Sequence, residues 1–135
     1  MRGRRSWPGL LVVAACAADP HVPTDGLLPL GSWGGKGAGV VVSEAQVHVH
    51  VGCTSGDIPG RLFVDVDGRF SVNGEYDPVV HPVAGVGIPM PATFSGRLRG
   101  RELTLVVVVQ DTVRHEVVTK GPVTVELGRE PELGP

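Results

Sequence analysis

Residues 93–110, TFSGRLRGRELTLVVVVQ, contain the pattern that decides the fold. Apolar and polar side chains alternate on both sides of the dipeptide Gly100-Arg101. Phe94 and Leu98 share one face before it, and every second residue of Leu103–Val109 shares one face after it. A period of two residues places such side chains on one side of a β-strand. The stretch therefore predicts two antiparallel strands joined by a tight turn, each burying one face.

The same alternation recurs through most of the chain after Gly31. Asp67-Gly68 is a strong signal for a two-residue hairpin turn between two of the alternating segments. We expect an all-β fold, a small antiparallel meander of about eight strands that forms a closed barrel or a two-sheet sandwich. The predicted strands are residues 28–33, 40–43, 45–53, 61–66, 69–76, 93–99, 102–110 and 123–127.

The composition supports this fold and excludes others. The chain has 135 residues, which is the size of one domain. Its 20 glycines and 12 prolines are set against 25 valines and 11 leucines, so enough apolar side chain is present for a core and disorder is disfavoured. The glycines have no three-residue period, which excludes collagen. The richness in Val, Gly and Pro disfavours a helix bundle.

The N-terminus has the layout of a secretory signal peptide. Residues 1–18 read MRGRRSWPGLLVVAACAA, with arginines at positions 2, 4 and 5 followed by an apolar run and small residues. The apolar run is far shorter than the roughly 18 residues that a permanent membrane-spanning helix needs. We therefore expect residues 1–15 to direct export and to be removed.

Within this segment, Val13-Ala14-Ala15-Cys16 resembles the lipobox of bacterial lipoproteins. The resemblance implies cleavage before Cys16 and attachment of acyl chains such as palmitate to that residue, which would then be the membrane anchor. Two or three acyl chains hold a protein stably on a membrane, whereas one chain holds it only marginally. The expected location is the cell envelope, at the outer membrane, periplasm or cell surface. The alternative is an ordinary signal cut near Ala17 or Ala18, which would give a secreted protein.

The net charge of the chain limits the kinds of partner that it can bind. The full chain has 12 basic and 14 acidic residues, a net charge of −2, and cleavage would remove three of the arginines. The remaining domain is acidic and has no basic run in its sequence, so nucleic acid is not an expected partner. We expect residues 16–29 to form a lipidated tether, residues 30–128 the β-domain, and residues 129–135 a flexible tail.

Gly31-Ser32-Trp33 resembles the Gly-x-Trp start of lipocalins and related barrels. The resemblance implies that Trp33 closes one end of a barrel whose cavity takes a small apolar ligand. A wider pattern, in which Gly52-Cys53 and residues 67–76 follow this start, resembles a group of small bacterial envelope proteins and implies no activity.

A long apolar connection could cover such a barrel. Residues 77–91 contain four prolines and many apolar side chains, and a loop of this length and composition must pack on something. It could be a lid over a barrel mouth, or a flap over the apolar outer face of the predicted strand at residues 102–110. Together with the lipocalin resemblance, it gives these expected ligand-binding residues: Trp33, Val79, Val83, Ile88 and Met90.

Two histidines and one cysteine are the remaining chemical candidates. His48 and His50 lie on one face of a predicted strand, as in some metal sites, and a third ligand would have to come from His81, His115, Asp57 or Glu116. The alternative is a pair of half-exposed histidines on a solvent face. Cys53 shares the strand parity of buried valines, so we expect a buried, inert thiol.

No motif for nucleophilic catalysis or for a phosphate-binding loop occurs in the sequence. We therefore expect no enzyme activity and no cofactor. The predicted function is a lipid-anchored envelope module that binds a small apolar ligand. One alternative is a structural or protein-interaction module that uses the apolar outer face around Val106 and Val108. The other is a metal-binding protein that uses His48 and His50.

Overall fold

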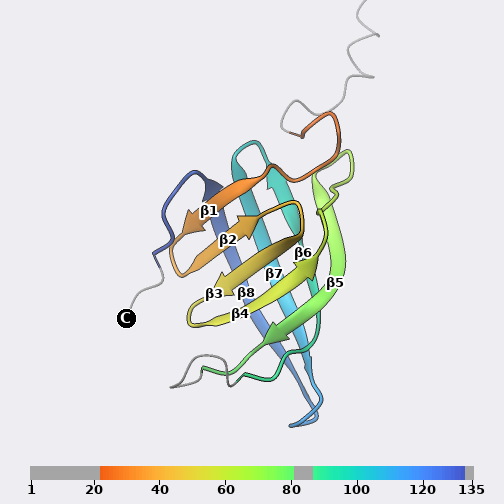
Figure 1. Ribbon diagram of the computed structural model, residues 1–135, viewed down its shortest axis with the longest axis vertical. Coiled ribbons are helices and arrows are strands. Elements are labelled where there is room, and N and C mark those ends of the chain that lie inside the picture. Colours follow the sequence, from red (N-terminus) through yellow and green to blue (C-terminus); the bar gives the residue numbers. More distant parts are fainter. Residues whose placement is uncertain (1–21, 81–86, 133–135) are drawn as a thin grey trace, which may run out of the picture.

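The computed structural model describes residues 22–80 and 87–132 of the chain. Within these ranges it contains eight antiparallel strands and no helix, and β8 pairs with β1 to close the sheet into a barrel (Figure 1). The predicted all-β meander is confirmed, and the barrel is the architecture that it forms. The strands are β1 (Gly31–Gly35), β2 (Ala38–Val42), β3 (Gln46–Val51), β4 (Thr54–Pro59), β5 (Arg69–Asp77), β6 (Met90–Arg99), β7 (Glu102–Asp111) and β8 (Glu116–Leu127).

The connections alternate between the two ends of the barrel, because each strand runs antiparallel to the one before it. Residues 22–30 lead into β1 at one end, called here the N-terminal end, where the β2–β3, β4–β5 and β6–β7 connections also lie (Figure 1). The described parts of the β5–β6 connection and the β7–β8 hairpin turn lie at the opposite end, called here the far end.

The inner face of the sheet is filled by apolar side chains. Trp33, Tyr76 and Phe94 are fully buried, and the Tyr76 and Phe94 ring centroids are 6.1 Å apart. Every second residue of Leu103–Val109 is buried, as the alternation predicts. The Tyr76 hydroxyl shares a hydrogen bond of 2.8 Å with Thr54 Oγ1, so this buried polar pair is satisfied. The side chains of the core thus occupy the middle of the barrel.

The prediction of a strand at residues 61–66 is wrong. These residues form the connection between β4 and β5, with one isolated bridge between Phe63 and Leu27. Leu62 and Val64 are buried, but Val66 is 76% exposed. The alternation therefore reflects burial beneath the N-terminal segment and not pairing within the sheet.

Sequence reasoning missed β4, which takes the place in the sheet expected for residues 61–66. Gly56 and Pro59 are residues typical of turns, and they conceal this strand. Gly56 is nevertheless required inside it, because a Cβ there would lie 2.4 Å from Cδ2 of Tyr76 and 2.2 Å from the Glu75 carbonyl oxygen. The absent side chain makes room for the Tyr76 ring.

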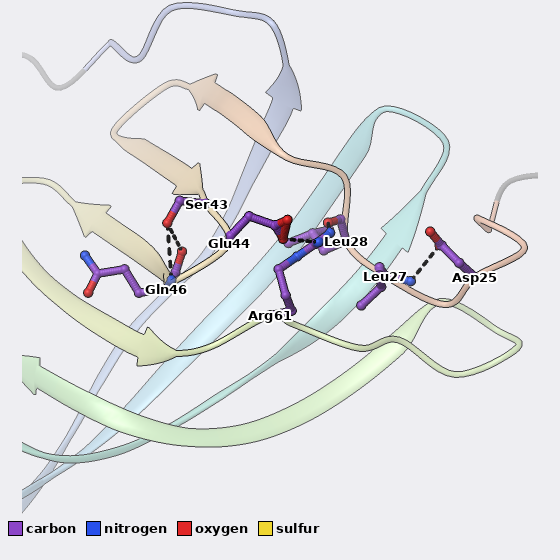
Figure 2. A network of polar contacts seen from close by, with 7 residues as sticks. All are labelled: Asp25, Leu27, Leu28, Ser43, Glu44, Gln46 and Arg61. Carbon is purple, nitrogen blue, oxygen red and sulfur yellow. Dashed lines mark hydrogen bonds and ion pairs between the residues drawn. The ribbon is translucent and has the colours of Figure 1, made fainter.

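Residues 22–29 were predicted as tether, but they pack on the N-terminal end of the barrel. Leu28 is fully buried, and its N–H donates to the Leu62 carbonyl at 2.9 Å. Figure 2 shows Arg61 beside this segment, where Nη1 donates to the Glu44 carboxylate at 2.6 Å and Nη2 to the Leu28 carbonyl at 3.3 Å. The domain therefore includes residues 22–29, and residues 16–21 lie outside the described part of the chain.

Part of the predicted flexible tail is also docked. The Glu132 N–H donates to the Gly35 carbonyl at 2.9 Å, and the Gly37 N–H donates to the Glu132 carbonyl at 2.7 Å. Residues 129–131 cross the outer face of β1 and β2 at Gly34 and Gly39. A Cβ on Gly34 would lie 2.2 Å from the Arg129 carbonyl oxygen. The tail segment can therefore lie this close to β1 because position 34 has no side chain.

Gly34→Ala should lower the free energy of unfolding by about 1–3 kcal/mol, because its methyl group enters space filled by the backbone of residues 129–131. Urea denaturation measures the change. In a chain that ends at Gly128 the same substitution should cost less than about 1 kcal/mol, since the obstructing segment is absent. Equal losses in the two chains would contradict the docking.

Candidate functional site

A pocket of about 110 Å³ lies at the far end of the barrel, between the β5–β6 connection and the β7–β8 hairpin turn. Its described lining is Asp77, Val79, Ile88, Met90, Asp111, Val113 and Arg114. The walls are mostly apolar, and the polar groups come from two aspartates and one arginine. A mostly apolar wall with a few polar groups is typical of small-molecule sites.

Asp111 builds the wall contributed by the hairpin. It is only 3% exposed, and its Oδ1 accepts hydrogen bonds from the backbone N–H groups of Val113 at 3.0 Å and Arg114 at 2.9 Å. The Arg114 guanidinium lies 3.5 Å from the other carboxylate oxygen, Oδ2. These contacts fix the turn after β7 and hold the Val113 side chain over the pocket.

The opposite wall comes from the ends of β5 and β6. Asp77 Oδ1 accepts the N–H of Val79 at 3.1 Å, which directs the chain as it leaves β5. Met90, the first residue of β6, is 5% exposed, and the Thr112 hydroxyl lies 3.5 Å from its sulfur. The start of β6, where the β5–β6 connection ends, therefore contacts the β7–β8 hairpin turn through Met90.

The structure brings together three of the five predicted ligand-binding residues. Val79, Ile88 and Met90 line this one pocket. Trp33 does not: it is fully buried, its Nε1–H donates to the Pro29 carbonyl at 3.3 Å, and it lines a different pocket, beneath the C-terminal tail segment. Val83 lies outside the described residues.

Large apolar side chains remain exposed around the pocket. Ile88 is 58% exposed and Val113 is 60% exposed, although both line it. Val80 and Val117, on the β5–β6 connection and on β8, are exposed to a similar extent. The apolar surface of the far end thus extends beyond the pocket. The predicted apolar outer face is less exposed, since Val106 and Val108 are half-buried.

A polar cluster lies on the outer face of β3 and β4. The strand register places His48 opposite Asp57. Nδ1 of His48 lies 2.6 Å from Oδ1 of Asp57, and Nε2 of His48 lies 2.9 Å from Nε2 of His50. One proton can sit between the two Nε2 atoms, but two cannot, because two N–H donors would then face each other.

This environment changes the protonation of His50. Burial lowers the pKa of His50 below its usual value of 6.5, the neighbouring His48 lowers it further, and Asp57 acts in the opposite direction. Burial and the neighbouring imidazole therefore favour the neutral form of His50.

In the described residues, only two side chains of the predicted metal site lie together. His48 and His50 lie together as expected, but no group of three or more His, Cys, Asp or Glu side chains in residues 22–80 and 87–132 is arranged to hold a metal ion. Protein metal sites of this kind normally use three or four ligands. Of the suggested third ligands, Asp57 contacts Nδ1 of His48, and His81 lies outside the described residues.

Cys53 differs from the expectation. It is exposed in the turn between β3 and β4, so the prediction of a buried thiol is wrong. Gly52 has a φ of 61°, and this turn conformation ends the alternation of β3 one residue before the cysteine.

Comparison with known proteins adds no family: neither family models, nor curated proteins, nor solved structures match this chain. In the described part of the chain, no helix is long and apolar enough to cross a membrane.

The free energy of unfolding should fall as the pH drops from about 7.5 to about 5.5, and it should fall less in His50→Gln. The pKa of His50 is lower in the folded chain than in the unfolded chain, so its stabilising effect is present above the unfolded value of 6.5 and is lost as the pH falls toward the folded value. Urea denaturation at both pH values measures the difference. His115→Asn, at an exposed turn, is the control and should behave as the parent chain does. Identical pH dependence in His50→Gln and the parent chain would contradict the assignment.

Proposed function

We propose that this protein is a lipid-anchored component of the bacterial cell envelope whose barrel is a non-catalytic binding module for a small apolar group. The observation that carries the proposal is the pocket at the far end, where Val79, Ile88, Met90 and Val113 converge. The barrel interior is filled by its own side chains, including Trp33, so we place the ligand at the end of the barrel and not in a lumen.

The size of the pocket limits the ligand. About 110 Å³ is less than the roughly 150 Å³ of a cavity that admits benzene. The pocket therefore suits the end of an alkyl chain, with the remainder of the ligand lying on the exposed surface of Ile88 and Val113. The Arg114 guanidinium at the rim could contact a polar head group.

Attachment of the protein to the membrane would come from Cys16 and not from the barrel. Six peptide steps separate Cys16 from Val22, and an extended chain covers at most about 3.6 Å per step, so the barrel would be held within about 22 Å of the lipid. Because residues 22–30 enter at the N-terminal end, the pocket at the far end would face away from the anchoring membrane.

1-Hexanol should bind at the far-end pocket with a Kd in the millimolar range, because burying about four methylene groups is worth about 3 kcal/mol. Titration followed by NMR should shift the signals of Val79, Met90 and Val113. Val113→Glu should weaken binding at least about tenfold, whereas Val66→Glu, on another exposed valine at the N-terminal end, should not change it. Absence of shifts at the lining residues would contradict the pocket as the ligand site.

Cys16→Ser should move the protein from the membrane fraction to the soluble fraction of cells, because the acyl chains would be lost. Fractionation followed by immunoblotting measures this. Cys53→Ser is the matched control and should remain with the membrane. If Cys16→Ser also remains there, the lipid anchor is wrong.

A further inference from the structure

Two arginines face each other on the outer surface of the sheet, away from the apolar pocket. Arg69 is the first residue of β5, and Arg97 lies directly opposite it on β6. Thr104 of β7 is the next residue in the same cross-strand row. All three lie near the N-terminal end of the barrel, since β5 and β7 begin there and β6 ends there.

Neither guanidinium has a carboxylate partner among the described residues. Arg69 forms no ion pair or side-chain hydrogen bond there, and the Arg97 side chain makes one hydrogen bond, from Nε to the Asp67 carbonyl at 3.1 Å. Like charges directly opposite on neighbouring strands are destabilising. An anion bound beside both groups would relieve this repulsion.

The surface beside the pair is hollowed. A groove of about 360 Å³ runs over β5, β6 and β7 and is lined by both arginines, by Ser95 and Thr104, and by Val106. Ser95 adds a hydroxyl group that can donate, and the Thr104 hydroxyl, which shares a hydrogen bond of 3.2 Å with Thr124 Oγ1, can donate to an anion when Thr124 donates to it.

Two nearby carboxylates, those of Asp65 and Glu102, do not pair with the two arginines. Asp65 Oδ1 is engaged by the backbone N–H groups of Asp67 and Arg69, each at 2.9 Å. Glu102 lies opposite Arg99, which is two residues beyond Arg97 on β6. Neither Asp65 nor Glu102 forms an ion pair with Arg69 or Arg97.

From this geometry we propose that the groove between Arg69 and Arg97 binds a phosphate group. A planar guanidinium presents paired donors that match the oxygen atoms of phosphate, and two such groups with adjacent hydroxyls can surround one phosphate. The phosphate could belong to a lipid headgroup or to a small soluble molecule. The headgroup source rests on the proposed anchor, which would hold the N-terminal end near the membrane, whereas the phosphate site itself does not depend on it.

The test uses the full chain with Cys16→Ser, so that acylation cannot attach it to vesicles. Inorganic phosphate should raise the Tm at constant ionic strength, because a ligand that binds only the folded state stabilises it. Arg69→Gln/Arg97→Gln should weaken phosphate binding at least about tenfold in calorimetric titration. Its Tm without phosphate should equal or exceed that of the parent chain, since the like-charge contact is gone, and this separates lost binding from unfolding.

Two further arms identify the source and the geometry. Vesicles of phosphatidylcholine containing phosphatidic acid should bind the protein, and the double variant should bind them at least about tenfold less tightly, if the phosphate is that of a lipid. Binding of inorganic phosphate without vesicle binding supports a soluble ligand. Arg69→Lys/Arg97→Lys should bind phosphate more weakly than the parent chain, because the paired donors are lost while the charge is kept.

Arg114→Gln, at the far end, is the control and should leave phosphate binding unchanged. Equal phosphate and vesicle binding by the parent chain and the double glutamine variant, or binding by neither, would overturn the proposal. Hexanol binding at the far-end pocket should be the same in the variants of Arg69 and Arg97 as in the parent chain, so failure of this proposal and failure of the proposed apolar site are distinguishable.

Discussion

Closure of the sheet between β1 and β8 is the constraint on which the rest of the structure depends. Only two residue pairs, Trp33 with Leu127 and Gly34 with Glu126, join these strands. They turn the two potential edges of the meander into a continuous wall and complete the enclosure of Trp33. The docked tail segment adds backbone hydrogen bonds beside this short seam, at Gly35 and Gly37.

Closure also separates the two chemically distinctive regions of the molecule. The apolar pocket depends on the β5–β6 connection meeting the β7–β8 hairpin, and it therefore belongs to the far end. The arginine pair depends on where β5 begins and β6 ends, and it therefore belongs to the N-terminal end. In an antiparallel meander, successive connections alternate between the two ends of the barrel. The charged groove and the pocket thus lie toward opposite ends of the barrel.

The sequence was sufficient for the fold class and for the strands whose alternation comes from the sheet itself, such as Leu103–Val109. It failed where contacts other than strand pairing determined which residues are apolar or small. Leu62 and Val64 are buried by residues outside the sheet, and Gly56 hides a true strand because an aromatic ring needs its space. Val79, Ile88 and Met90, which the apolar loop suggested as ligand-binding residues, line one pocket in the structure. Asp111 and Val113 could not be added, because their contribution requires the path of the closed barrel.

The packing of residues 22–30 has a mechanical consequence for a protein held by its N-terminus. Tension applied at the N-terminus acts on Leu28 before it acts on β1. There it is resisted by a buried side chain and by the hydrogen bond between Leu28 and Leu62, while a second bond joins Val64 to Gly26. Load is thereby transferred to the β4–β5 connection, away from the two-pair seam. Tension applied at the N-terminus would therefore act on the contacts of this segment before it acts on the two residue pairs that join β1 to β8.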